Sequence, residues 1–206
     1  MVPPESTNRG RCGAMATMND SNDVKTVVTG FERAREHSPF LAQMMARHAE
    51  AAWQAAERAG EEGKDVAQTL RWRRGAVALV TGVADLAGTW NLDHVMHVLS
   101  DFADEAVEAA LLAAFAERYP DEEPRGFAVI ALGKHGSREL NYSSDIDPIL
   151  IFDPATLPKR AREEPVEAAV RLARRMCEIL SARDGDGYVF RVDLRLRPSP
   201  EATPIA

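Results

Sequence analysis

Apolar residues recur every three or four positions through the first half of the chain, which is the spacing of one buried face of an α-helix. The pattern predicts a helix that starts at Ser38, a second over about 65–86 and a third over about 92–118. Pro120 ends the third, because proline cannot continue a helix. We therefore expect a helical region over residues 25–120.

The second half has strand-like patterns. Residues 126–132 form an apolar run typical of a strand covered on both faces, and 145–152 form a second run, in which Pro148 predicts a bulge or an unpaired strand edge. Residues 188–196 alternate strictly between apolar and polar, which predicts a third strand. A helix that starts at Pro165 precedes it. The sequence predicts an α+β protein with a small mixed sheet.

These patterns divide the chain into three parts. Residues 1–24 are rich in Pro, Gly, Ser, Asn and Asp and lack an apolar period, so we expect a disordered tail. Residues 25–120 form the helical region, and 121–206 form the core with the strands. The core stops where its third strand ends, so we expect it to be truncated at its C-terminal end.

The turn between the first two strands is rich in groups that bind phosphate. It reads GKHGS over residues 133–137 and leads into a short helix expected over about 137–141. Its glycines expose backbone N–H groups without Cβ obstruction, beside a hydroxyl and a cation at a helix start. We interpret the turn as a phosphate site and His135 as a histidine on its surface, with a phosphate contact as the alternative.

Two carboxylates open the second strand. Asp145 and Asp147 leave the same face of an extended chain, roughly 6.6 Å apart along it. Like charges this close need a cation, a shared proton or solvent between them. A pair of metal ions can use such carboxylates to neutralise phosphate oxygens and align the reacting groups, and oxygen ligands suit Mg²⁺. The pair therefore indicates magnesium-dependent phosphate chemistry.

Asp193 is the candidate for a third carboxylate. The alternation of the third strand places it on a polar face with Arg191 and Arg195. For this strand alone, a surface strand with a salt-bridge ladder is the alternative. In combination with the glycine turn and the first two aspartates, the pattern favours one site built from both strands.

Two features of the helices have structural interpretations. Cys177 lies on the apolar face of the helix that starts at Pro165, so we expect a buried packing residue and not a nucleophile. Arg71, Arg73 and Arg74 follow one another closely on a helix. We interpret them as a solvated helix face, with a ligand contact as the alternative.

Composition and net charge indicate which classes of partner the protein fits. The chain of 206 residues has a formal net charge of -7 and a pI near 5.3, which disfavours non-specific nucleic-acid binding and fits a protein or nucleotide partner. The two cysteines form neither a disulfide framework nor a metal-ligand spacing, and no apolar run reaches the ~18 residues of a membrane span. We therefore expect a cytoplasmic protein with neither nucleic acid nor membrane as partner.

The order of the motifs resembles a known superfamily. The Gly-Ser pair at 136–137, the Asp-Ile-Asp triplet at 145–147 and the later strand acid Asp193 are similar to the nucleotidyltransferases that include DNA polymerase beta. The longer string GKHGSRELNYSSDID, followed after a helix by YVFRVDLRLRPSPEATP, resembles the bacterial glutamate-ammonia-ligase adenylyltransferase/deadenylylating enzymes. The resemblance implies a polymerase-beta-like nucleotidyltransferase domain over 121–206.

The resemblance also implies an activity. Members of this family move AMP onto and off a tyrosine of glutamine synthetase. Addition uses ATP and releases pyrophosphate, whereas removal uses orthophosphate and releases ADP. Full-length members are much longer and carry two nucleotidyltransferase domains under control of the PII signalling protein and glutamine. The ending PSPEATPIA and the position of the motif are similar to the N-terminal, AMP-removing half, so we expect a fragment of that half.

Matched position by position, the resemblance assigns roles to residues. Asp145 and Asp147 would hold Mg²⁺, and Asp193 would complete the site or help to deprotonate the attacking group. Ser144 would order the turn before the first two aspartates. The nucleotide- and phosphate-binding candidates are Gly133, Lys134, Gly136, Ser137, Ser144, Arg195 and Arg197.

Two other functions stay open from the sequence. The same fold could serve a nucleotidyltransferase for a small molecule, another protein or a nucleic acid, although the acidic balance disfavours nucleic acid. The chain could also be an inactive regulatory or binding fragment of the larger enzyme. Transfer of AMP from adenylylated glutamine synthetase to phosphate separates these functions.

Overall fold

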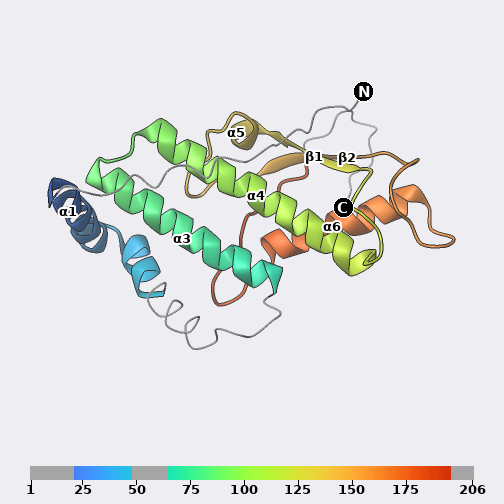
Figure 1. The fold of residues 1–206 in the computed structure, drawn as a ribbon, viewed down its shortest axis with the longest axis horizontal. Helices are drawn as coiled ribbons and strands as arrows, with labels where there is room; N and C mark the ends of the chain where they lie inside the picture. Colours follow the sequence, from blue (N-terminus) through green and yellow to red (C-terminus); the bar gives the residue numbers. More distant parts are fainter. Residues whose placement is uncertain (1–20, 48–64, 196–206) are drawn as a thin grey trace, which may run out of the picture.

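The computed structural model describes residues 21–47 and 65–195. Helices precede and flank a small sheet, which confirms the α+β prediction (Figure 1). None of the helices in the described ranges is both long and apolar enough to cross a membrane. In chain order the elements are α1 (Ser21–His37), a helical stretch over 39–47, α3 (Val66–Ala87), α4 (Leu92–Arg118), β1 (Phe127–Leu132), α5 (Gly133–Gly136), β2 (Asp147–Phe152) and α6 (Pro165–Ser181).

The second and third predicted helices are confirmed as α3 and α4, and their ends show why they form there. The Asp65 side chain accepts a hydrogen bond from the backbone N–H of Ala67 at 3.2 Å. The Asn91 side chain accepts one from His94 at 2.8 Å. Both satisfy donors that a helix start leaves unpaired. After α3, Gly88 has a φ of 70°, the left-handed conformation that glycine adopts at helix ends.

The apolar pattern does not indicate α1, which begins at Ser21 inside the segment expected to be disordered. Its valines, threonines and Gly30 lower the helix propensity, so packing on α3 has to stabilise it. A Cβ added at Gly30 would lie 2.8 Å from the Cβ of Ala87, so the glycine lets the two helices approach closely. Residues 1–20 of the expected tail lie outside the described residues.

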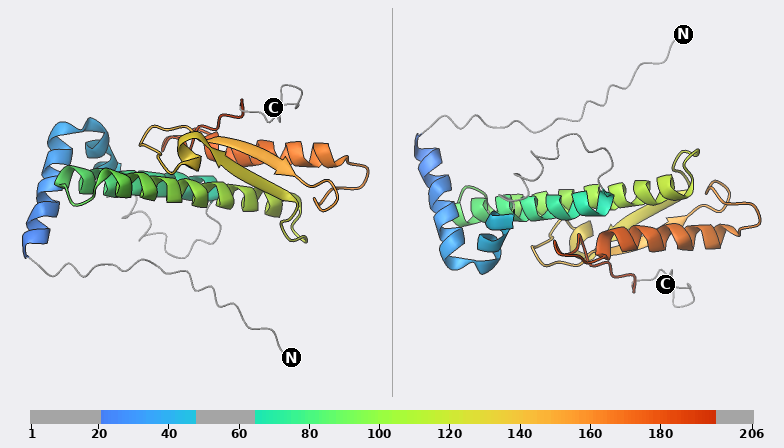
Figure 2. Two further views of the ribbon diagram at one scale, coloured as in Figure 1. Left: turned by 90° about the horizontal axis from the view of Figure 1, so that it is seen from above. Right: turned by 90° about the horizontal axis from the view of Figure 1, so that it is seen from below.

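β1 and β2 form an antiparallel pair in unbroken register. Helices α4 and α6 lie alongside the sheet (Figure 2), and Phe127 and Phe152 pack into the apolar cluster that the two helices share. On the opposite face, Ile130 and Ile151 are each 45% exposed. The expectation that β1 is covered on both faces is therefore wrong, because the described helices cover only one.

The third strand expected over 188–196 is wrong as a full strand. Within the described residues it is a single parallel bridge between Ile146 and Val192. Alternate residues of a strand direct their backbone groups to the same side, so Pro148 is the next residue after Ile146 that faces the 188–195 segment. Proline has no backbone N–H to donate, so the parallel pairing cannot continue there. The expected bulge at Pro148 is also wrong, since the register with β1 is unbroken. The expected unpaired edge lies on the other side of β2, where the parallel pairing stops.

The main core joins α3, α4 and α6 to the sheet, and includes Leu70, Phe102, Ile146, Met176 and Leu180. Cys177 is half-buried on α6 beside this core. Burial raises the pKa of its thiol to about 11, so the thiol stays protonated near neutral pH. This agrees with a packing residue and not with a nucleophile.

Two leucines of α4 offer a matched test of this core. Leu99 is 8% exposed and belongs to the main cluster, whereas Leu112 is 46% exposed. Leu99→Ala should lower the free energy of unfolding by about 2–5 kcal/mol, because it removes buried methyl groups and leaves a cavity. Leu112→Ala should change it by about 0.5 kcal/mol or less. Urea unfolding measures both values, and equal losses would contradict the packing described.

Candidate active site

One parallel bridge brings the three aspartates to one face. The backbone N–H of Ile146 donates to the Arg191 carbonyl at 3.0 Å, and the N–H of Asp193 donates to the Ile146 carbonyl at 2.9 Å. Side chains alternate along both segments, so Asp145 and Asp147, together with Asp193, leave the face opposite to Ile146. Ile146 is fully buried. The carboxylates therefore project from the open face of the sheet.

Arg191 is the ion-pair partner of Asp145. Its Nη1 donates to the Tyr188 hydroxyl at 2.8 Å and its Nη2 donates to the Ser143 carbonyl at 2.9 Å. The arginine thus ties the turn before Asp145 to the segment that leads to Asp193. The hydrogen bond with Asp145 raises the pKa of Arg191. The Asp145 side chain is 44% exposed, so its carboxylate remains accessible from solvent.

Arg195 lies in the field of all three carboxylates. Its backbone N–H donates to Asp193 Oδ1 at 3.0 Å, and its Nε lies 2.9 Å from both carboxylate oxygens of Asp193. These bonds lower the pKa of Asp193 to about 2. Asp193 raises the pKa of Arg195 most, and the charges of Asp147 and Asp145 raise it further. One guanidinium therefore interacts with the whole acidic group.

The glycine turn lies directly against Asp147. Gly133 has a φ of +56°, and a Cβ added there would lie 2.8 Å from Oδ2 of Asp147. At Gly136 an added Cβ would lie 2.5 Å from the Ala131 carbonyl oxygen. A side chain at either position would collide with its neighbour or strain the backbone. The two glycines therefore allow the turn to fold back onto β1 beside a carboxylate.

The short helix after β1 is α5, so the helix predicted over 137–141 is wrong. Arg138 has a φ of 60°, the left-handed conformation that ends a helix. The Ser137 hydroxyl lies within its own turn and donates to a carbonyl oxygen at 3.1 Å. Lys134 is exposed. The phosphate-binding roles of this turn stay predictions.

His135 is buried, with 5% exposed, so its interpretation as a surface histidine is wrong. Its Nε2 lies 2.8 Å from a carboxylate oxygen of Asp104 on α4. The turn folds back so that this side chain points into the protein instead of toward an incoming phosphate. His135 thus ties the glycine turn to α4.

The turn before Asp145 is ordered by its own side chains. The backbone N–H of Asn141 donates to the Ser144 hydroxyl, and the N–H of Ser143 donates to the Asn141 side chain, both at 3.0 Å. These contacts fix the approach of the chain to the aspartates. Arg197, a predicted phosphate-binding residue, lies outside the described residues.

Two arginines of α3 are not the solvated face that the sequence indicated. Arg71 is only 8% exposed. Arg74 donates to the carbonyls of Val189 and Tyr142 at 2.6 and 3.1 Å, and its guanidinium lies 4.7 Å from the centre of the Phe190 ring. Burial lowers the pKa of Arg74. Arg74 on α3 thus joins the segment that leads to Asp145 to the segment that leads to Asp193. Helical spacing alone does not reveal this role.

The aspartates fit a magnesium ion in type and in backbone position. Carboxylate oxygens are the ligands that Mg²⁺ prefers, and the three side chains share one face. Within residues 21–47 and 65–195, however, no three His, Cys, Asp or Glu side chains stand around one point as a metal site requires. Asp145 turns to Arg191 and Asp193 turns to Arg195. For Mg²⁺ to bind, the carboxylates of Asp145 and Asp193 would therefore have to break their ion pairs with these arginines and turn toward the ion.

An α+β core that presents same-face carboxylates beside a glycine-serine turn has the features of a nucleotidyltransferase. A family model described as glutamate-ammonia ligase adenylyltransferase matches residues 29–206. The chain belongs to this family, which confirms the resemblance seen in the sequence.

Curated relatives carry the name bifunctional glutamine synthetase adenylyltransferase/adenylyl-removing enzyme. The protein of Caulobacter vibrioides is 43% identical over 150 residues, which cover 68% of this chain and 15% of that protein. The protein of Xanthobacter autotrophicus is 40% identical over 163 residues, 74% of this chain and 16% of that protein. A Bradyrhizobium protein is 38% identical over 189 residues, which cover 85% of this chain and 19% of that protein. The chain thus spans less than a fifth of the length of these relatives.

Gly133→Ala tests the close approach of the turn to Asp147. A non-glycine residue in the left-handed region costs about 1–3 kcal/mol, and the new methyl group would displace the Asp147 carboxylate. We expect this loss in the free energy of unfolding by urea denaturation. Gly185→Ala is the matched control, because its added Cβ meets no atom within 4 Å. Equal stability of the two variants would contradict the turn geometry.

The pairing of Asp193 with Arg195 predicts a low titration midpoint. By carbon-detected NMR, the Asp193 carboxyl should titrate with a pKa of about 2. Arg195→Gln removes the donor and should raise this pKa toward the ordinary value of about 3.9. Arg35→Gln, on α1, should leave it unchanged. An ordinary midpoint in the unsubstituted protein would show that the two side chains do not pair in solution.

Proposed function

We propose that this chain carries a nucleotidyltransferase core that moves an adenylyl group to and from a tyrosine of glutamine synthetase, in the direction of phosphate-dependent AMP removal that releases ADP. The observation that carries the proposal is that the backbone register places Asp145, Asp147 and Asp193 on one open face beside the glycine turn. Membership of the adenylyltransferase family and the names of the relatives support the substrate class.

Charge neutralisation is the main task of the proposed site. Orthophosphate and the adenylyl phosphodiester are both anions, so their approach to three carboxylates needs positive charge. Asp145, Asp147 and Asp193 would hold Mg²⁺, which when bound neutralises phosphate oxygens and aligns the reacting groups. Arg195 would share this task, because its planar guanidinium fits phosphate oxygens. Backbone N–H groups of the turn over 133–137 would orient the phosphate.

The proposed reaction is a single displacement at phosphorus. An orthophosphate oxygen attacks the adenylyl phosphorus, the bond from phosphorus to the tyrosine oxygen breaks, and the products are ADP and free tyrosine. The proton of the attacking phosphate passes to the leaving phenolate. Asp193, whose pKa is about 2, is a poor proton acceptor near neutral pH, so we assign it to cation binding and not to general-base catalysis.

The proposed partners follow from the family. Glutamine synthetase is the protein substrate, ATP, ADP and orthophosphate are the small substrates and products, and the PII signalling protein is a regulator. The cytoplasm is the compartment in which they would meet. If the chain instead serves another substrate or is an inactive fragment, it will release no ADP from adenylylated glutamine synthetase.

Asp145→Asn tests the proposed chemistry. With adenylylated glutamine synthetase, Mg²⁺ and orthophosphate, the unsubstituted chain should release ADP, and the variant should release it at least about 100-fold more slowly, because a charge-stabilising group is lost. Folding should persist, since an exposed ion pair such as Asp145 with Arg191 contributes only about 0–1 kcal/mol.

Asp121→Asn serves as the control for that assay, because Asp121 is exposed in the loop after α4 and lies outside the site. It should retain full ADP release. Unchanged ADP release by Asp145→Asn would refute the role of this carboxylate. Absence of ADP release by the unsubstituted chain would favour another substrate or an inactive fragment.

A further inference from the structure

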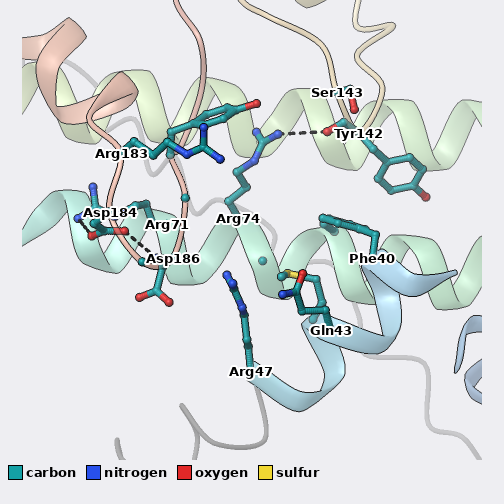
Figure 3. A pocket seen from close by; sticks show the side chains of 16 residues that line it. Phe40, Gln43, Arg47, Arg71, Arg74, Tyr142, Ser143, Arg183, Asp184 and Asp186 are labelled. Carbon is teal, nitrogen blue, oxygen red and sulfur yellow. Dashed lines mark hydrogen bonds and ion pairs between the residues drawn. The ribbon is translucent and has the colours of Figure 1, made fainter.

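A cavity of about 400 Å³ lies beside the turn that precedes Asp145, and Tyr142 and Ser143 of that turn line it (Figure 3). The helical stretch over 39–47, α3 and the loop over 183–187 bound it. None of the three candidate catalytic aspartates lines it. Its volume is that of a small-molecule site. The cavity therefore holds none of the carboxylates of the proposed reaction site, although Ser143 and Tyr188 in its lining contact Arg191, the ion-pair partner of Asp145.

Arginines dominate the polar wall of this cavity. In a chain with a net charge of -7, four arginines face only two aspartates here. One of those acids is already neutralised, because Asp184 forms an ion pair with Arg71 at 2.6 Å. The charged lining residues are Arg47, Arg71, Arg74, Arg183, Asp184 and Asp186. The cavity thus favours an anion.

The arginines divide into two groups by their contacts. Arg71 and Arg74 are held in the wall by carbonyl oxygens and Asp184. The buried Nε of Arg71 has no acceptor in the described part of the chain. Arg47 and Arg183 form no hydrogen bond or ion pair with a described residue. In Figure 3 Arg47 extends from its helix toward the centre of the cavity, with its guanidinium directed into that space.

The chemistry of the lining residues favours a phosphate over a carboxylate. A phosphate offers three terminal oxygens to guanidinium forks that come from different elements, whereas a carboxylate offers only two oxygens. Phe40, Met44 and Tyr188 also line the cavity and add apolar surface, against which the rest of a phosphate-bearing molecule could pack. We propose that this cavity binds a phosphate-bearing small molecule and that Arg47 and Arg183 contact the phosphate.

Calorimetric titration of the chain in EDTA tests this site without metal-dependent chemistry. The probes are orthophosphate and AMP, with succinate as the dicarboxylate comparison. At least one phosphate probe should bind, and Arg47→Gln and Arg183→Gln should each weaken it about tenfold or more. Neither arginine has a described structural contact, so both variants should fold. Tighter binding of AMP would identify a nucleotide site, and equal or tighter binding of orthophosphate would identify a free-phosphate site.

Two matched variants control for phosphate binding elsewhere on the chain. Arg35→Gln removes an exposed arginine of α1, and Asp121→Asn changes an exposed acid in the loop after α4, so both should bind the probe as the unsubstituted chain does. The proposal fails if no phosphate probe binds at millimolar concentration, if succinate binds equally well, or if Arg47→Gln and Arg183→Gln bind normally. These outcomes do not depend on ADP release, so the proposed function can fail while this site stands.

Discussion

Two backbone hydrogen bonds at Ile146 determine the candidate site. They join β2 to the segment around Val192, and the parallel register that they set decides which side chains share a face. A shift of one residue would move Asp193 to the buried side, because side chains alternate along an extended chain. The buried side chain of Ile146 fixes this register from within the core. The acidic group on the surface is thus a consequence of apolar packing beneath it.

Arg74 secures the same arrangement from the helical region. A cation partly removed from water is costly unless its donors are paired, and half-buried Arg74 donates to carbonyls of Val189 and Tyr142, on either side of the bridge. Its guanidinium also lies against Phe190, a residue of the main apolar cluster. That cluster contains residues of α3 and α4 together with residues of the 121–206 region. The helical region therefore helps to build the site and is more than a neighbour of it.

The apolar period together with end signals such as Asn91 and Pro165 predicted α3, α4 and α6, because each helix buries one regular apolar stripe. The positions of the three aspartates on one face also followed from alternation. What the sequence could not show was long-range: α1 depends on the fit of Gly30 against α3, and His135 points inward only because the turn folds onto α4. The third strand was predicted too long because its pattern says nothing of Pro148, which lies on the neighbouring strand.

The open face of the sheet has a consequence for electrostatics. Asp147 shares that face with Ile130 and Ile151, so apolar surface borders the carboxylates while bulk water still reaches them. In water the attraction between a guanidinium and a phosphate is strongly reduced by the high dielectric constant. A macromolecular surface that covers the two isoleucines would expel that water and lower the local dielectric constant. The strength of every charge interaction at the aspartates is then set by how completely the arriving surface seals this face.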